Sequence, residues 1–144
     1  MRKTSEAIYN ILVADNSLIS MLASNAPFYN PSGTKTRSNS IIPADIVERA
    51  LDTPFLVIQE GSESMLDEHL RSETIFIRCY NDRVKSYIDI NKILDRVQTL
   101  LHEAQFSIDD RTLVRCQWET TLPGLLDESI GLKFKESRYR LLVL

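Results

Sequence analysis

Residues 84–103 constrain the fold of this chain more than any other stretch. Their apolar residues recur with the period of a helical turn: Tyr87, Ile90, Ile93, Leu94, Val97, Leu100 and Leu101. This pattern predicts one long amphipathic helix. Two β-type runs, 54–61 and 69–81, precede it, and two more, 112–121 and 132–144, follow it. We therefore expect an α+β fold: a small mixed or antiparallel sheet of about four to five strands, with the long helix and N-terminal helices packed on one face and the other face free.

Length and composition indicate one ordinary globular domain over 1–144. The chain has 144 residues, of which 43% are hydrophobic and 26% charged, as is typical of globular proteins. The formal net charge of −3 argues against nonspecific DNA wrapping, which needs a basic surface. No apolar run reaches the roughly 18–20 residues of a membrane span. Asn10 and Asp15 interrupt the apolar stretch after the basic N-terminus, so we expect a surface helix of a cytosolic protein rather than a signal peptide.

Two cysteines, Cys79 and Cys116, lie inside predicted strands. No CxxC pair occurs, so their spacing indicates neither a zinc site nor a redox motif. We expect two buried free thiols that act as small hydrophobic side chains. A disulfide between adjacent strands is the alternative, which an intracellular setting disfavours.

The N-terminal third predicts two helices and a long polar loop. The first helix begins at residues 4–5, where a Thr or a Ser can cap it, and Asp15 can cap a second short helix. Residues 25–45 then contain three prolines, one glycine and many Ser, Thr and Asn residues, which is typical of a loop. Loops of this length in compact domains are usually functional or disordered. Its basic residues Lys35 and Arg37 are therefore candidate partner contacts.

The predicted strands indicate which face of the sheet a partner would meet. The run 55–58 is continuously apolar, as in a central strand with both faces covered. In the next run, the odd-numbered residues of 75–79 are apolar and indicate the core face. The opposite face mixes aromatic and polar groups, as a partner-contact surface would: Thr74, Phe76, Arg78 and Tyr80.

The segment 60–68 carries four acidic residues and no basic one: Glu60, Glu63, Asp67 and Glu68. We expect an exposed hairpin connection. It lacks the alternating ligands, central glycine and distal glutamate of a calcium loop, so no metal site is expected.

No motif for catalysis or cofactor binding is present in the sequence. There is no GxSxG, no GxGxxG and no GxxxxGK[ST], and His69 and His102 stand apart from any Ser or Cys pattern. We expect no enzyme activity, no cofactor and no metal. Strand arginines and nearby aromatics could stack nucleic-acid bases, but no RNA-recognition motif occurs and the net charge opposes this interpretation.

The order of elements resembles the tail terminator, or tail completion, family of long-tailed bacteriophages and related prophages. The resemblance covers nearly the whole chain. It rests on an N-terminal helix, the loop Phe28-Tyr29-Asn30-Pro31, the strand 54–58, the strand 75–80 ending in an aromatic residue, the helix 84–103 and the final strand 138–141. Two departures are the long polar segment 30–45 and the long strand 112–121 with the loop that follows it.

This resemblance implies structural work in a virion. Such proteins assemble into a hexameric ring that caps the tail tube, stops polymerisation and offers a docking surface to the head connector or neck protein, while DNA passes through the lumen. The chain would be made in the bacterial host cytoplasm and located at the tail–neck junction. The loop 30–45 and the face of Thr74, Phe76 and Tyr80 could form the ring interface. The acidic residues Glu60, Glu63, Asp67 and Glu68 could line a lumen that repels DNA, or simply confer solubility.

The sequence alone leaves two other classes open. One is a head–tail connector or neck adaptor that binds a single partner chain through a sheet edge. The other is a small ligand-binding α+β domain, which would need an apolar pocket with converging polar groups.

Overall fold

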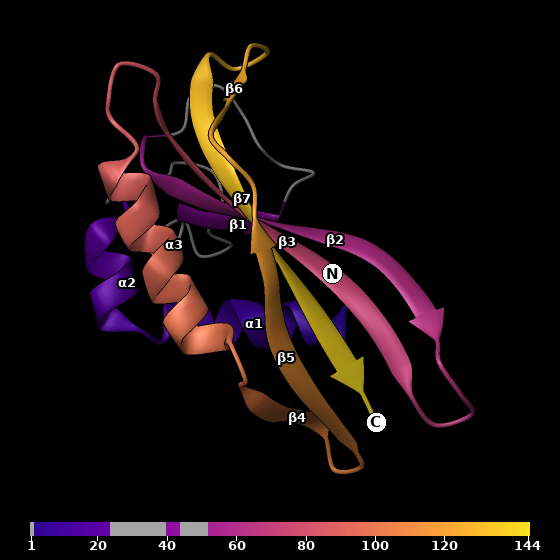
Figure 1. The fold of residues 1–144 in the computed structure, drawn as a ribbon. Coiled ribbons are helices and arrows are strands. Elements are labelled where there is room, and N and C mark those ends of the chain that lie inside the picture. The colour runs from indigo at the N-terminus through magenta and orange to yellow at the C-terminus, as the bar shows by residue number, and fades with distance from the viewer. Residues whose placement is uncertain (1, 24–39, 44–51) are drawn as a thin grey trace.

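The fold is dominated by one large mixed sheet. The computed structural model describes residues 2–23, 40–43 and 52–144. Three helices, α1 (Lys3–Val13), α2 (Asn16–Met21) and α3 (Ile88–Leu101), lie beside a strongly twisted sheet (Figure 1). The strands are β1 (Ile41–Pro43), β2 (Phe55–Met65), β3 (Arg71–Asp82), β4 (Gln105–Asp109), β5 (Thr112–Thr121), β6 (Leu125–Asp127) and β7 (Leu132–Val143).

The sheet has seven strands in the order β1-β2-β3-β7-β5-β4, and β6 adds to β7 off this path. Among the described strands, only β1 pairs in parallel, with β2, and the other pairs are antiparallel. The expected fold, a small sheet of four to five strands beside a long helix, is therefore wrong. Strands β1 and β6 have three residues each and β4 has five, so they are too short to show a periodic pattern in the sequence. They form because their backbones pair with longer neighbouring strands.

The long helix is shorter than its pattern predicts. It begins at Ile88 rather than residue 84, and its N-cap is Tyr87. The Asp82 carboxylate accepts a hydrogen bond from the backbone N–H of Val84, and its carbonyl accepts one from Lys85. Asp82 therefore holds a turn before the helix.

The N-terminal helices pack through their apolar side chains. Ile8 and Leu12 of α1 and Leu18 of α2 are buried in the main core. The Asp15 carboxylate caps α2 by accepting a 2.9 Å hydrogen bond from the N–H of Leu18, as expected. The expected cap at residues 4–5 is wrong, because α1 starts earlier, with Arg2 as its N-cap.

The main core lies between the three helices and one face of the sheet. It combines Ile90, Ile93, Val97 and Leu101 of α3 with inward side chains of β2, β3, β5 and β7. A second, smaller cluster lies on the opposite face: Ile42, Phe55, Val57 and Tyr80. The run 55–58 is fully buried, because its alternate residues enter the two clusters, which confirms the prediction of a strand covered on both sides.

Both cysteines are buried free thiols, as predicted. Burial raises the pKa of Cys79 far above its ordinary value and that of Cys116 to about 12. No helix within residues 2–23, 40–43 and 52–144 is long and apolar enough to span a membrane.

Candidate partner-binding surfaces

Strand register divides the sheet face opposite the helices into three bands. Cross-strand partners on β3, β7 and β5 point to the same side of a sheet, so the even-numbered residues of β3 and β7 share this face. From one end to the other, the bands are an aromatic cluster, an arginine band and a leucine row.

The aromatic cluster closes the end of the face next to β6. The Tyr80 ring lies between Phe55, at 5.1 Å between centroids, and Phe134, at 5.0 Å. Tyr80 is only 2% exposed, so this candidate contact residue supports the fold and does not face a partner. Burial raises the pKa of its hydroxyl, and the hydrogen bond and charge of Arg78 only partly offset this effect.

The arginine band occupies the middle of the face. It contains Arg78, Arg138, Arg140 and Arg115. Nε of Arg78 donates a 2.7 Å hydrogen bond to Glu136, and Nε of Arg140 donates a 3.0 Å hydrogen bond to Ser72. Burial lowers the pKa of Arg78, but the hydrogen bond and charge of Glu136 and Tyr80 outweigh it, so the net shift is upward. Glu136 and, at the β5 bulge, Glu119 are the acidic residues here, so the band is basic.

Two of the predicted contact residues, Thr74 and Phe76, lie half-buried within this band. The Phe76 ring lies under the guanidinium group of Arg138, whose carbon is 5.2 Å from the ring centroid. A Cβ atom on Gly61 would come within 2.8 Å of that ring, so glycine is needed for this close packing. Phe76 therefore positions Arg138 at the surface.

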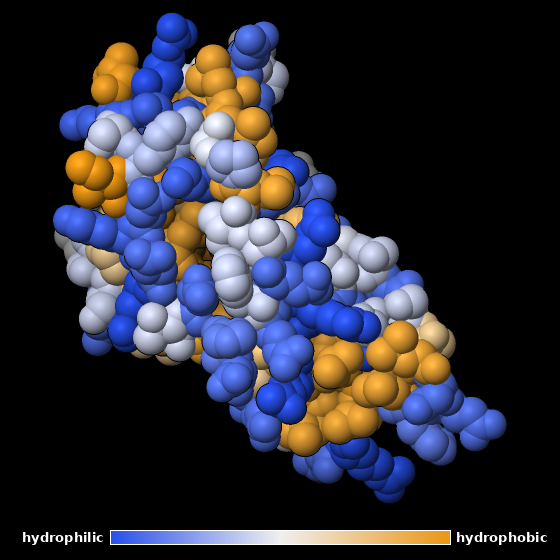
Figure 2. Space-filling view, viewed as in Figure 1, coloured by the Kyte–Doolittle hydropathy of each residue, from blue (hydrophilic) through white to orange (hydrophobic). Residues whose placement is uncertain are grey.

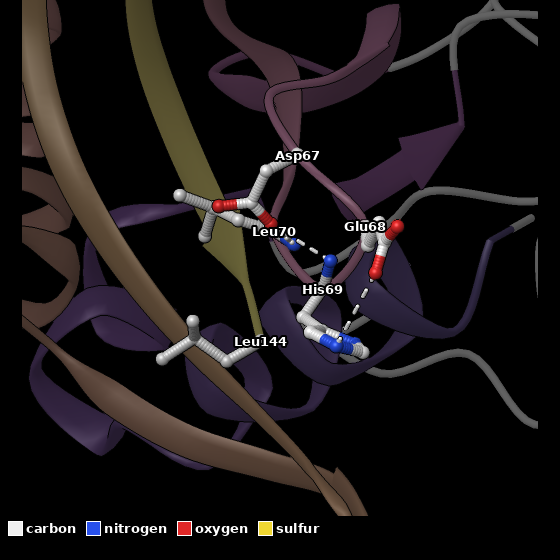
Figure 3. Close-up of a pocket in the computed structure, with 5 residues that line it drawn as sticks. All are labelled: Asp67, Glu68, His69, Leu70 and Leu144. Carbon is white, nitrogen blue, oxygen red and sulfur yellow. Dashed lines mark hydrogen bonds and ion pairs between the residues drawn. The ribbon is translucent and has the colours of Figure 1, made fainter.

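The leucine row lies at the far end of the face. Leu144 follows β7, and its N–H bonds to the carbonyl oxygen of Leu113. Leu142 pairs with Arg115 on one side and with Ser72 on the other. Two residues further along in the same register, toward the C-terminus of the chain, Leu144 lies between Leu113 and Leu70. Figure 2 shows apolar surface gathered at the lower end, where Figure 1 places the C-terminus and the β4–β5 turn. An open hollow of about 400 Å³ lies between Leu144 and the turn at 67–70 (Figure 3).

The acidic segment 60–68 is mostly strand, and only its end forms the exposed hairpin connection that the sequence predicts. Strand β2 continues to Met65. The carboxylates of Glu60 and Glu63 each lie 3.4 Å from Nε of Arg2, and Glu63 also lies 3.7 Å from Arg71. Burial raises the pKa of Glu60, but hydrogen bonds from the Arg2 N–H and Ser5, with the charge of Arg2, lower it overall. Arg2 therefore lies between these two acids beside α1, and Arg71 lies between Glu63 and the buried Glu73.

The other two acids of the segment, Asp67 and Glu68, lie in the exposed turn between β2 and β3. The Asp67 carboxylate accepts hydrogen bonds from the N–H groups of His69 and Leu70 at 2.7 and 2.9 Å, and Glu68 lies 4.0 Å from His69 (Figure 3). The structure therefore separates the four acids into two pairs with different surroundings. Lys35 and Arg37 lie outside the described residues.

A second exposed apolar surface lies at the opposite end of the molecule, around β6. Leu125 and Leu126 are 47% and 51% exposed. Two adjacent leucines in a connection between strands are either buried under the turn or exposed as a contact point. In this structure they are exposed. The segment is anchored: β6 pairs with β7, and a Cβ on Gly124 would come within 2.2 Å of the Tyr87 ring.

No group of three His, Cys, Asp or Glu side chains within the described residues could hold a metal ion. His102 accepts a 3.1 Å hydrogen bond from the Trp118 N–H and borders an open hollow on α3 with Asp95, Gln98 and Thr99. This polar lining differs from the apolar pocket that a ligand-binding domain would need.

Comparison with known proteins places the fold. Neither the known protein families nor the curated proteins include a match to this chain. Among solved structures, the fold is similar to a chain from the "Virion of native gene transfer agent (GTA) particle", with a TM-score of 0.67 and 15% sequence identity. The alignment covers 96% of this chain and 92% of that chain. At this identity the similarity shows a shared fold.

Proposed function

We propose that this chain is a structural protein of a phage-like particle, which caps the tail tube as a ring, ends tail polymerisation and joins the tail to the head. The observation that carries the proposal is the nearly end-to-end fold similarity to a chain of a gene transfer agent virion.

The order of elements supports the finer assignment to tail termination. The strands at 54–58, 75–80 and 138–141, through which the chain resembles tail terminators, correspond to parts of β2, β3 and β7. These are neighbouring strands in the sheet, so the resemblance falls on one continuous part of the fold. A hexamer is the ring that the resemblance implies, with the tail tube protein and the head connector as its other partners.

The chemistry of the surfaces supports binding instead of catalysis. An arginine band beside exposed leucines is typical of a protein interface, where Arg and apolar side chains combine. In such a ring, Asp67 and Glu68 remain candidates for facing passing DNA. Glu60 and Glu63 are poor candidates, because Arg2 and Arg71 lie beside them.

Tail length provides the direct test. Particles produced without this chain should contain tail tubes of uncontrolled length and heads without tails in electron micrographs, since nothing would stop tube growth. Supplying the chain in trans should restore one narrow length, and a variant at an exposed position outside the bands, such as Lys92→Ala, should restore it equally well.

The adaptor alternative predicts a different outcome. The strand β4 pairs only with β5 among the described strands, and such a free edge could hold one partner chain. Loss of an adaptor would leave tails of normal length that fail to join heads. That result would refute tail termination and favour the adaptor.

A further inference from the structure

We propose that copies of this chain join head to tail, with the β6 arm of one copy seated on the arginine–leucine face of the next. The β6 arm is residues 125–128. The arginine–leucine face is the leucine row with the adjoining arginines: Leu70, Leu113, Leu142, Leu144, Arg115 and Arg140. This inference rests on the proposed function and deepens it by naming the contact that would build the ring.

The first observation is how the exposed apolar side chains are distributed. Among the described residues, the large hydrophobic side chains that are exposed form two groups at the two ends of the molecule. One group lies at the end with the leucine row: Met65, Leu66, Leu113 and Leu144. The other lies around β6 and the turn before α3: Val84, Ile88, Leu125 and Leu126. Apolar surface at both ends, rather than scattered singly, indicates two interaction sites.

The two ends cannot contact each other within one copy. Leu126 pairs with Lys133 at the start of β7, whereas Leu142 lies near its end. The strand between these two positions spans roughly 30 Å at the usual rise per residue. Figure 1 shows β6 and the C-terminus at opposite ends of the sheet. Any contact between the two surfaces must therefore be made between copies.

The β6 arm is exposed and is held in one conformation by its own hydrogen bonds. Its two leucines are exposed, and the acidic Asp127 and Glu128 follow them directly. The Asp127 carboxylate accepts hydrogen bonds from the N–H and hydroxyl of Ser129, and the Asp127 carbonyl accepts one from the N–H of Gly131. Pairing with β7 fixes the other side of the arm. Because the arm is already ordered, binding costs little conformational entropy.

The arginine–leucine face complements this arm in both respects. Its leucines offer apolar surface for Leu125 and Leu126, and Arg115 and Arg140 offer positive charge for Asp127 and Glu128. Arg115 and Arg140 are exposed and have no ion pair among the described residues. Both arginines lie next to the leucines. Arg115 pairs directly with Leu142 across the sheet, and Arg140 contacts Ser72, which pairs with Leu142 on its other side.

A second copy fits this face better than DNA does. Phosphates would bind the arginines but leave the leucine row in water, whereas a protein partner can cover both. The complementary apolar and acidic surface is present on this same chain. Contacts between two unlike patches are heterologous, and they generate a ring when the rotation between copies closes.

Mixing two variants tests the contact directly. The face variant Arg115→Glu with Arg140→Glu keeps an intact arm, and the arm variant Leu125→Ser with Leu126→Ser keeps an intact face. Each variant alone should be monomeric by light scattering under conditions where the wild type assembles. Each should raise the concentration needed for assembly by about 100-fold or more. An equimolar mixture should form a dimer and nothing larger, because only one intact contact remains per pair.

The controls separate assembly from folding. The double variant Lys3→Glu with Lys92→Glu reverses two exposed charges on α1 and α3 and should assemble as the wild type does. All variants should keep the wild-type urea midpoint when measured as dilute monomers, since the substituted side chains are exposed.

Three outcomes would overturn the inference. They are unchanged assembly by the face or arm variant, a mixture that stays monomeric, and a wild type that is monomeric at its highest soluble concentration. In none of these cases is the proposed function decided, because the tail-length experiment measures it independently. Conversely, normal tail lengths in particles without this chain would refute tail termination even if the head-to-tail contact forms.

Discussion

The aromatic stack of Phe55, Tyr80 and Phe134 offers a quantitative test of what fixes the β6 end of the sheet. Tyr80 is the central ring, with neighbours at 5.1 and 5.0 Å, whereas each outer ring has one neighbour in the stack. An aromatic pair contributes about 0.5–1.5 kcal/mol beyond the apolar area it buries. Tyr80→Leu removes two pairs, and Phe55→Leu or Phe134→Leu removes one.

The free energy of unfolding should follow that count. Loss of the aromatic pairs should lower the free energy of unfolding by about 1–3 kcal/mol in Tyr80→Leu and by about half as much in each outer variant. Repacking around the new leucine should cost less than about 1.5 kcal/mol more, and this cost should be similar in all three variants. Tyr80→Phe keeps both ring contacts and serves as the control. It should cost no more than about 1 kcal/mol, the value of one hydrogen bond.

Urea unfolding followed by circular dichroism measures these differences. It should be done at one low protein concentration, because self-association stabilises the folded state by mass action. In double-mutant cycles, Tyr80 should couple with each outer ring, and the two outer rings should be additive within about 0.5 kcal/mol. If Tyr80→Leu costs no more than Phe55→Leu, ring stacking does not hold this cluster together and the reasoning is wrong.

Three further predictions concern single side chains. Gly124→Ala should destabilise the fold by about 1–3 kcal/mol in urea unfolding, because its Cβ would overlap Tyr87, and adding Tyr87→Ala should recover part of the loss. The hydrogen bonds from Arg96 lower the pKa of Asp15, although burial opposes them. The stabilisation that ionised Asp15 contributes should therefore be fully present above its unfolded pKa of about 3.9 and be lost as pH falls through its lower folded pKa. Acidification should thus lower the free energy of unfolding of Asp15→Asn less than that of the wild type. Cys79 should react with a thiol reagent only in denaturant, because burial raises its pKa; rapid reaction in the native state would contradict its burial.

Local patterns predict the long elements of this fold well. The runs 112–121 and 132–144 match β5 and β7 within one residue. Each contains an alternating apolar segment that packs in the main core, residues 114–118 in β5 and 139–143 in β7. The continuous apolar run 55–58 also predicts its strand correctly, since a short run of this kind is typical of a strand buried on both faces.

The short strands and the acidic segment depend instead on contacts between distant parts of the chain. Ile41–Pro43 forms a strand only because β2 lies parallel to it, and three residues carry no period of their own. Glu60 and Glu63 are typical of an acidic loop, yet β2 continues through them because Arg2 and Arg71 approach from elsewhere in the sequence. Tyr80 depends on tertiary structure in the same way. Alternation places it correctly on the face opposite the helices, but only the folded chain shows that Phe55 and Phe134 cover it.

Both proposed assembly surfaces are attached to one strand, and this has a consequence for ring geometry. The β6 arm pairs with the first residues of β7, and the leucine row lies around its last ones. The angle between the two surfaces is therefore set by the twist of β7 and by the packing of its ends. In a heterologous assembly, this angle determines how many copies close a ring. Loosening the aromatic cluster with Tyr80→Leu should thus broaden the distribution of ring sizes in negative-stain images before it weakens the contact itself. A variant that assembles into rings of one unchanged size would show that the angle is set at the interface between copies.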